Sequence, residues 1–386
     1  MNILFICAGH GLDDDRVTRK EALSLTRMGH RVTVCAQWRR PYSERPVELY
    51  DVDTMQLVNE ETRLDNITMS HVLRAKRIPK LLKLYKKAKP DLIVAHEFET
   101  ACLAWWIKKR YGTQYVFDAH EGYEYTVPLA TPKIMRWLTV PLARWMLRMV
   151  VRGAAGITAA SPGALTYQLG VRYGKPTAVL HNAPLMEYFP YTEEETDPIT
   201  IVHEGNLSLD RGALEIIDAI AIVSRTHKCK LLILGTVEAS VKNLLDKKIE
   251  EYGLGDVVKM AGRLPWDEFG KVETTGQIGL ICMQPLKNNM TSLSNKLYNY
   301  MACGLAVLAM KGSQTEQIIN EVKSGICVDT TSPREIANGI IWLIEHPNER
   351  RLMAKNGRSA MENVYGWHKM EHTMKETYSK IMKELT

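Results

Sequence analysis

The 386-residue sequence lacks the features of secreted, metal-clustered and membrane-spanning proteins. Its seven cysteines are scattered and form no Cys-x-x-Cys pair, so neither a disulfide framework nor a zinc ribbon is indicated. We interpret them as small buried hydrophobic residues of a protein in a reducing compartment. The N-terminus has no basic region followed by a long apolar stretch and a small-residue cleavage site, which predicts a cytoplasmic protein.

Long apolar runs, repeats and low-complexity tracts are also missing. The most membrane-like stretch, residues 137–151, contains Arg144 and Arg148 and is too short and too charged to cross a bilayer. The hydrophobic content of 45% and the charged content of 24% are ordinary for a folded globular protein. Because the chain is longer than a single hydrophobic core usually grows, we expect two domains.

Charge is unevenly distributed along the chain. Residues 1–185 hold 27 Lys and Arg against 17 Asp and Glu, a net charge of +10, whereas residues 186–386 hold 23 against 27, a net charge of −4. A basic first half predicts an anionic partner, such as a membrane surface, a nucleic acid or a phosphorylated ligand.

Short β-branched runs alternate with helix-length amphipathic segments, which predicts two series of βαβ units around parallel sheets. The first series has expected strands at residues 3–7, 31–36, 92–95, 115–118, 156–159 and 177–180. The second has them at 199–203, 230–234, 257–260, 278–282, 306–309 and 325–328. Helices are expected at 16–28, 72–88, 134–152 and 367–385. The acidic, proline-bounded segment 187–198 is interpreted as a hinge between the two series.

The loops that follow the strands are the candidate sites, because open α/β sheets bind ligands beyond the carboxyl ends of their strands. After the first strand, Gly9-His10-Gly11 lets the backbone approach a ligand closely, and Arg16 opens the next helix. The third glycine of the dinucleotide motif is absent, with Asp14 in its place, so a nicotinamide cofactor is disfavoured. We interpret the run Asp13-Asp14-Asp15 as helix capping rather than a metal site.

Histidines follow two of the strands in the first series. His120 comes after the apolar run Tyr115-Val116-Phe117, and His96 occupies a similar but weaker position after the strand at 92–95. A histidine can donate or accept a proton near neutral pH, which makes His120 a candidate for chemistry. It could equally be a structural hydrogen-bonding group at a strand end.

In the second half, Gly205, Asn206 and Arg211 combine a flexible backbone, a helix N-terminus and a guanidinium. This combination suits a diphosphate, because arginine supplies forked donors and the helix end adds positive potential. The alternative is an arginine that is merely solvated near a capped helix start.

A later helix carries Lys296 and Asn299 three residues apart on one face. A cation and an amide in this arrangement could reach the phosphate and the ribose of one ligand. Ser294 and Asn295 precede them and could cap this helix in any protein.

These segments, in this order and spacing, resemble the family 4 glycosyltransferases, which have the GT-B fold. The resemblance is carried by Asp15-Arg16-Val17, Glu21-Ala22, Gly29-His30-Arg31-Val32-Thr33-Val34, Asp118-Ala119-His120-Glu121, His181-Asn182-Ala183-Pro184, Gly205-Asn206, Arg211-Gly212, the stretch 296–307 and Tyr365-Gly366-Trp367. It implies two Rossmann-like domains whose parallel sheets face a cleft. Residues 1–187 would bind the acceptor, residues 188–365 would bind the nucleotide sugar, and residues 366–386 would form a terminal helix that crosses back to the first domain.

The resemblance also implies roles for individual residues. His120 would lie beside the reacting sugar, Arg211 and Lys296 would neutralise the donor diphosphate, and Asn299 would take the ribose-binding position. The further donor-binding residues would be Gly205, Asn206, Ser294 and Asn295, and the acceptor-binding or cleft residues would be Gly9, His10, Gly11, Arg16, His96 and Glu121. The family's two glutamates separated by seven residues are absent, with Thr291 and Asn299 in their places, and Asn206 stands where an arginine is common.

The implied reaction transfers a sugar with retention of configuration, without an essential metal and without a cofactor. We expect a nucleotide-sugar donor, UDP-sugar rather than GDP-sugar, and a glycan or lipid-linked acceptor of cell-surface polysaccharide or glycoconjugate synthesis. One alternative is a nucleotide-sugar epimerase on the same fold, which would need no acceptor. Another is a non-catalytic, membrane-associated partner subunit, which the missing glutamates would favour.

Two acid-free basic stretches indicate where the positive charge of the first half acts. Residues 71–89 contain eight Lys or Arg beside an apolar stripe, and residues 131–160 interleave five Lys or Arg with Trp137 and Trp145. Basic amphipathic helices with tryptophan favour anionic lipid, so we expect a peripheral protein on the inner face of the cell membrane. The alternative is that both stripes face the core and the lysines face water. Nucleic acid is disfavoured, because no recognition motif accompanies the charge.

Overall fold

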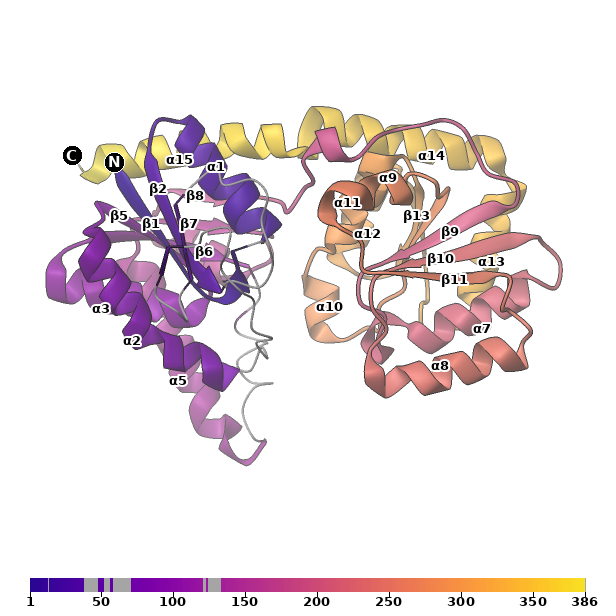
Figure 1. Cartoon of the computed structure of the whole chain (residues 1–386), viewed down its shortest axis with the longest axis horizontal. Coiled ribbons are helices and arrows are strands. Elements are labelled where there is room, and N and C mark those ends of the chain that lie inside the picture. Colours follow the sequence, from indigo (N-terminus) through magenta and orange to yellow (C-terminus); the bar gives the residue numbers. More distant parts are fainter. Residues whose placement is uncertain are drawn as a thin grey trace. The chain divides into compact units, whose positions relative to one another are not determined.

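The computed structural model describes residues 1–12, 14–37, 48–51, 56–57, 71–120, 123 and 133–385. The chain divides into two compact units (Figure 1): unit 1 comprises Met1–His181 and Met370–Thr386, and unit 2 comprises Asn182–Lys369. The expected boundary after residue 187 lies a few residues beyond this division.

Unit 1 is built on one twisted sheet. Its strands lie in the order β4-β3-β2-β1-β5-β6-β7-β8, and every described pair is parallel except β3 with β4. The strands are β1 (Asn2–Gly11), β2 (Arg31–Gln37), β3 (Glu48–Asp51), β4 (Gln56–Leu57), β5 (Leu92–His96), β6 (Gln114–Ala119), β7 (Gly156–Ala159) and β8 (Thr177–Val179). The order reverses beside β1, which pairs with β2 on one side and β5 on the other, and this is where an open sheet leaves room for a ligand.

Helices surround this sheet (Figure 1). They are η1 (Asp15–Ala22), α1 (Leu23–Arg27), α2 (His71–Ala88), α3 (Phe98–Tyr111), η2 (Lys133–Met135), α5 (Arg136–Gly153), α6 (Leu165–Arg172) and the terminal α15 (Trp367–Leu385). Side chains of α2, α3, α5 and α6 share one core with the sheet. The terminal helix packs closely: a side chain at Gly156 would meet Ile381 Cδ1 at 2.3 Å.

Unit 2 contains a second, wholly parallel sheet in the order β11-β10-β9-β12-β13-β14. Its strands are β9 (Ile199–Glu204), β10 (Cys229–Leu234), β11 (Val258–Gly262), β12 (Ile278–Ile281), β13 (Ala306–Met310) and β14 (Gly325–Val328). The central strands are buried on both faces, as parallel strands covered by helices require. Here the order reverses beside β9, which pairs with β10 and β12.

The helices of unit 2 form two layers around this sheet. One layer contains α7 (Ala213–Val223), α8 (Ala239–Glu251) and α13 (Pro333–Glu345). The other contains α9 (Trp266–Glu273), α11 (Asn295–Cys303), α12 (Gln314–Val322) and η5 (Met361–Tyr365), with α14 (Pro347–Ala360) beside α11. The short elements η3 (Met186–Tyr188), η4 (Leu209–Arg211) and α10 (Lys287–Thr291) lie in loops.

The sequence-based strands and helices are confirmed within a few residues, and the structure adds β3 and β4. These two strands are short, and neither has the apolar β-branched run on which the strand predictions depended. In the part of the chain that the structure describes, no helix has the length and apolar content needed to span a membrane.

Candidate functional site

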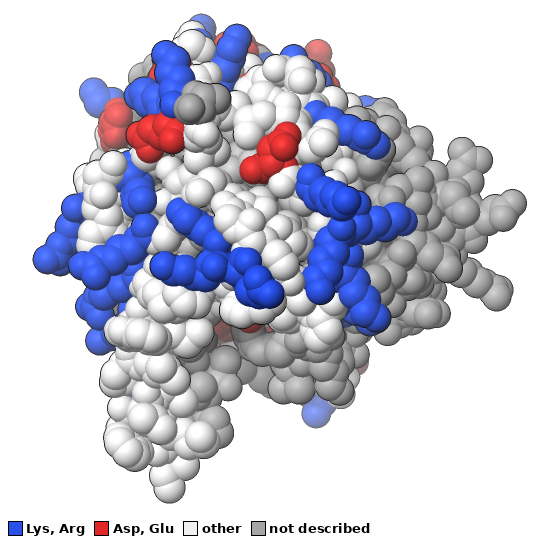
Figure 2. All heavy atoms as spheres, turned by 90° about the vertical axis from the view of Figure 1, so that its left-hand side faces the viewer, with Lys and Arg blue, Asp and Glu red and all other residues white. Residues whose placement is uncertain are grey.

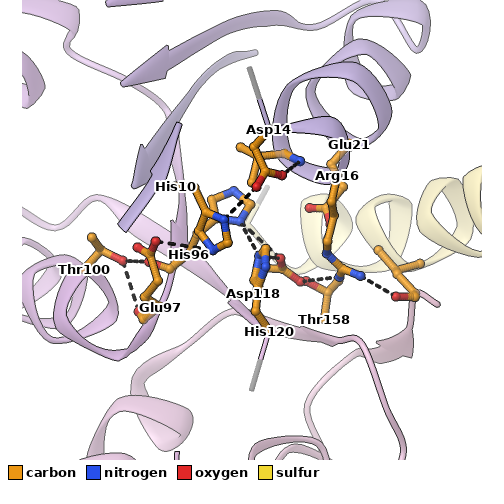
Figure 3. Close-up of polar contacts among 12 residues, drawn as sticks. His10, Asp14, Arg16, Glu21, His96, Glu97, Thr100, Asp118, His120 and Thr158 are labelled. Carbon is orange, nitrogen blue, oxygen red and sulfur yellow. Dashed lines mark hydrogen bonds and ion pairs between the residues drawn. The ribbon is translucent and has the colours of Figure 1, made fainter. Parts of the chain in front are cut away.

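In unit 1, polar side chains gather where β1, β5, β6 and β7 end (Figure 3). Asp118 of β6 is fully buried at their centre, and its Oδ1 accepts hydrogen bonds from Arg16 Nη2 at 3.0 Å and Thr158 Oγ1 at 2.6 Å. Its Oδ2 lies 2.6 Å from His120 Nε2 and 3.1 Å from His96 Nδ1. Burial alone would raise the pKa of Asp118, but Arg16 and the imidazoles outweigh it and hold that pKa well below its usual range.

The ionised Asp118 carboxylate fixes how His120 is protonated. Because a carboxylate only accepts, the His120 ring donates its Nε2–H, which leaves Nδ1 as the nitrogen with a lone pair. Burial lowers the pKa of His120 to about 3, and the opposing effect of Asp118 does not offset it. His120 is therefore a neutral imidazole at neutral pH, able to accept a hydrogen bond or a proton at Nδ1.

A second imidazole, His10, lies against His120 with its ring plane tilted by 43° and is in the opposite charge state. The ring centroids lie 4.4 Å apart, and His10 Nδ1 is 2.8 Å from Asp14 Oδ2. Burial works to lower the pKa of His10, but Asp14 and then Glu97 outweigh it and raise that pKa to about 9. The site thus pairs a cationic with a neutral histidine, and a pair of titratable groups with separated pKa values is typical of acid–base and charge-stabilising sites.

Glu97 supports the glycine loop and was missed by the sequence analysis. Its carboxylate accepts hydrogen bonds from the backbone nitrogens of Ala8 and Gly9, both at 2.9 Å, and lies 3.4 Å from His10 Nε2. Its own φ is +68°, a left-handed conformation that only a well-packed site sustains in a non-glycine residue. The available signal was an acidic residue directly after His96, at the end of a buried strand.

The other residues that the sequence analysis considered for a site in unit 1 each have a different place in the structure. Arg16 is buried beneath the site, where it pairs with Glu21 at 2.8 Å and donates to Leu180 O at 2.6 Å, so it reaches the cluster through Asp118. Asp14 caps η1 by accepting from Val17 N at 3.0 Å, as the capping interpretation expects. Gly9 and Gly11 lie in β1 and are buried. Glu121 is outside the described residues.

His96, Asp118 and His120 also meet the geometric requirement for a metal site, since their ligand atoms lie within 4.8 Å of one another. Asp118, however, already neutralises the guanidinium of Arg16 and accepts from Thr158. The hydrogen-bond network therefore accounts for this arrangement with protein groups alone.

In unit 2, two cations converge on the loop that follows β9. Gly205 has a φ of +84°, and a side chain built there would lie 3.5 Å from Arg211 Nη1 and 3.7 Å from Lys296 Nζ. In the described part of the chain, neither cation forms an ion pair with a carboxylate. Gly212, with a φ of +72°, has no room for a side chain, because its Cβ would meet Cys282 O at 2.1 Å. The backbone at these two glycines carries no side chain and lies beside two cations, which suits the binding of a phosphate group.

The remaining residues predicted in unit 2 surround this pair. Asn299 donates from Nδ2 to Glu204 Oε1 at 3.1 Å, and Asn206 accepts from Arg211 Nη1 at its backbone oxygen at 3.1 Å. Ser294 stands at the start of α11 but its side chain makes no capping hydrogen bond, and Asn295 is exposed. Glu204 is a neighbour that the sequence analysis did not include.

Burial lowers the pKa of Lys296 to about 8, although Glu204 opposes the shift. Anion binding by Lys296 needs the protonated amine, so we expect the affinity for a nucleoside diphosphate to fall as the pH rises from 7 to 9. Calorimetric titration across this range measures the change. A Lys296→Arg variant serves as the control, because arginine stays charged and should flatten the pH profile. An equally steep profile in Lys296→Arg would show that another group titrates.

Comparisons with known proteins agree with this architecture. Residues 15–183 match the family model described as "Glycosyl transferase 4-like domain", and residues 187–360 match "Glycosyl transferases group 1". An uncharacterized glycosyltransferase of Methanocaldococcus jannaschii is 33% identical over 90 residues, which span 23% of this chain and 23% of that relative.

Two solved structures have a similar fold along nearly the whole chain. Sucrose-phosphate synthase from Thermosynechococcus elongatus has a TM-score of 0.75 at 15% identity, with 99% of each chain covered. HepE of Anabaena, solved in complex with UDP, has a TM-score of 0.69 at 15% identity, with 98% of this chain and 100% of that chain covered. HepE has also been solved in complex with UDP-glucose.

Proposed function

We propose that the chain, which matches two glycosyl transferase family models over residues 15–183 and 187–360 and has a GT-B fold, transfers a sugar from a nucleotide sugar to a glycan acceptor. The observation that carries this proposal is the approach of Arg211 and Lys296 to the bare backbone at Gly205. A diphosphate bound there would be neutralised as it leaves the sugar, and stabilising charge that develops on a leaving group is a major source of catalysis.

For the donor, we propose a UDP-sugar rather than a GDP-sugar. The support is indirect: HepE, which shares the fold, has been solved with UDP and with UDP-glucose. We further propose that transfer retains the anomeric configuration and needs neither metal nor cofactor, with Arg211 and Lys296 supplying the positive charge at the diphosphate. Turnover that survives EDTA would support the metal-free part of this proposal.

We propose that the acceptor binds at the cluster of polar side chains in unit 1. Neutral His120, with its Nδ1 lone pair, would lie beside the reacting sugar, and cationic His10 would add positive charge to the same surface. The acceptor would be a glycan, free or lipid-linked, of cell-surface polysaccharide or glycoconjugate synthesis.

Product analysis tests the proposed reaction against its alternatives. The purified protein is incubated with labelled UDP-sugars, with and without a membrane lipid extract as the acceptor source. We expect label in the lipid or glycan fraction together with free UDP. Epimerised UDP-sugar formed without acceptor would instead identify an epimerase, and intact donor without nucleotide binding would favour a non-catalytic subunit.

We also propose that unit 1 binds an anionic membrane surface from the cytoplasmic side. The two basic stretches behave differently in the structure. In α2 the apolar stripe faces the core, with Leu81 and Leu84 buried. In η2 and α5 several apolar residues face outward instead, with Ile134 82%, Trp137 78% and Trp145 58% exposed, while Leu147, Val150 and Val151 of α5 are buried in the core.

Exposed basic side chains accompany this apolar surface. They include Lys83, Lys86, Lys87 and Lys89 of α2 and its end, Lys109 and Arg110 of α3, and Arg144, Arg148 and Arg152 of α5. Figure 2 shows that Lys and Arg side chains gather on one face of unit 1 with few acidic side chains among them. Tryptophan beside such charges favours the lipid interface, and each basic residue near an anionic surface adds about 1 kcal/mol.

Liposome flotation tests the membrane proposal. We expect binding to vesicles that contain anionic lipid and little binding to neutral vesicles, and we expect Trp137→Ser with Trp145→Ser to reduce anionic binding by about tenfold or more through lost apolar burial. The matched control is Leu352→Ser, which removes an exposed apolar residue of α14 in unit 2. Equal flotation of all variants, or of both vesicle types, would contradict the proposal.

A further inference from the structure

Glu97, which follows β5 directly, has an unusual backbone conformation at the start of α3. Its φ of +68° is uncommon for a residue that has a side chain. Its carbonyl oxygen accepts hydrogen bonds from the first turn of α3, from Ala101 N at 3.1 Å and from Thr100 Oγ1 at 3.0 Å. Such conformations persist where the surrounding structure enforces them, and they cluster at functional sites. The conformation therefore indicates a role for Glu97 beyond starting α3.

The carboxylate of Glu97 fixes the backbone that carries His10. Its Oε2 accepts from Ala8 N and its Oε1 accepts from Gly9 N, both at 2.9 Å. A group that accepts at both oxygens has the pattern of an ionised carboxylate. Burial raises the pKa of Glu97, while His10 and the two backbone N–H groups oppose the rise. Glu97 thus contributes negative charge and a fixed position to the loop at the end of β1.

His10 lies between two carboxylates, one beside each ring nitrogen (Figure 3). Nδ1 is 2.8 Å from Asp14 Oδ2, and Nε2 is 3.4 Å from Glu97 Oε1. Because a carboxylate only accepts hydrogen bonds, a neutral ring would turn a lone pair toward one of these negative oxygens. The doubly protonated ring instead has an N–H group for each carboxylate, and the nearby Asp118 adds to the negative surroundings. The geometry therefore favours the imidazolium form of His10.

The charge of His10 acts on His120, whose ring centroid is 4.4 Å away. His120 Nε2 lies 2.6 Å from Asp118 Oδ2, a contact that favours a charged ring, and 3.0 Å from His96 Nδ1. Burial is the main cause that lowers the pKa of His120, and the His10 cation and Arg16 lower it further against the effect of Asp118. Since like charges in contact disfavour each other, a cationic His10 helps to keep His120 neutral.

We infer that Glu97 and Asp14 are positioning residues that hold His10 as a cation, and that this cation keeps His120 the neutral imidazole of the proposed sugar transfer. The inference rests on the proposed role of His120. It gives His10 an indirect role, because both of its ring nitrogens face protein carboxylates and its charge acts on the neighbouring ring.

Nuclear magnetic resonance measures the charge of each ring directly. The full-length protein is labelled with nitrogen-15 in its histidines, and the ring nitrogens are followed between pH 5 and pH 10. His10→Gln and His120→Ala identify the two sets of signals by their disappearance. We expect His10 to carry both ring protons at pH 7 and to lose one at about pH 9. We expect His120 to stay neutral throughout this range.

Glu97→Gln removes one of the two carboxylates while keeping the shape of the side chain and one oxygen for a backbone N–H. We expect His10 to titrate about one pH unit lower or more, because the cation loses an adjacent negative charge. Asp14→Asn removes the other carboxylate, keeps a side chain that can cap η1, and should shift the titration in the same direction. The matched control is Glu384→Gln, an exposed acid of α15 in the same unit, which should leave the titration of His10 unchanged. Thermal unfolding of each variant checks that the fold is intact.

His10→Gln tests the link between the two rings. Loss of the cation removes a repulsion, so we expect His120 to be protonated at a pH about one unit higher or more than in wild type. Protonated His120 should then appear at pH 5 in the variant but not in wild type. The turnover of the variant relative to wild type should also fall as the pH drops from 7 to 5, whereas a merely structural loss would lower turnover by the same factor at each pH.

The outcomes distinguish the inference from the proposed function. A wild-type His10 ring with a single proton at pH 7, or a titration that both Glu97→Gln and Asp14→Asn leave unchanged, overturns the inference. A His120 signal that His10→Gln does not alter overturns the link between the rings. A lower titration of His10 in both carboxylate variants, with earlier protonation of His120 in His10→Gln, supports the inference. If the rings behave in this way but wild type transfers no sugar, the proposed function is wrong and the charge arrangement stands.

Discussion

Alanine at Arg211 or Lys296 is expected to lower the affinity for UDP by about ten- to a hundredfold, the scale of a charge-assisted hydrogen bond. Both cations converge on Gly205, and neither is neutralised by an ion pair in the part of the chain that the structure describes. A phosphate bound there would lose a charged donor in either variant. Calorimetric titration of each variant with UDP measures the loss.

The control for this experiment is Arg225→Ala, which removes an exposed arginine just beyond α7, outside the loop at Gly205. It should bind UDP as wild type does. If Arg211→Ala and Lys296→Ala also bind UDP normally while remaining folded, the nucleotide does not use this loop, and the donor site must lie elsewhere in the molecule.

Replacing His120 by alanine is expected to reduce the turnover number by about a hundred- to ten-thousandfold, the range reported for groups that assist proton transfer. The affinity for UDP should change little, because His120 belongs to unit 1 and the proposed donor residues belong to unit 2. Turnover and UDP affinity are measured on the same preparation, so that a loss of fold would be seen in both.

His372→Ala is the matched control, since His372 is an exposed histidine of α15 in the same unit. Its turnover should equal that of wild type. Asp118→Asn offers a second check, because it leaves the shape of the cluster but removes the charge that orients the His120 ring. Normal turnover in His120→Ala would show that this imidazole takes no part in the reaction.

The parallel sheets could be predicted because their strands are continuous apolar runs such as Leu92 to Ala95, which must be buried on both faces. The positions of His120, Arg211 and Lys296 also followed from the sequence, since each lies just beyond a strand or at a helix start. The sequence does not show which segments contact each other in the folded protein. The contacts of Glu97 with the glycine loop and of Asn299 with Glu204 join residues about 90 positions apart, and only the folded sheets bring them together.

The two basic stretches show a different limit of sequence patterns. Both have an apolar stripe beside a row of Lys and Arg, and the period of the stripe is helical in each. The periodicity predicts that a helix has an apolar and a polar face, but it does not predict which neighbouring element covers the apolar face. The sheet covers Leu81 and Leu84 of α2, whereas Trp137 and Trp145 of α5 are exposed. The same pattern therefore lies in the core along α2, whereas in α5 it is divided between the exposed tryptophans and the buried Leu147, Val150 and Val151.

The measurement that tests the donor site most directly is calorimetric titration of the full-length protein with UDP, GDP, ADP and CMP. The account predicts saturable, stoichiometric binding of one of these nucleotides, UDP, that is lost at equal concentration in Arg211→Ala. Binding of none of the four by a folded protein would contradict the account and make the non-catalytic subunit the leading explanation.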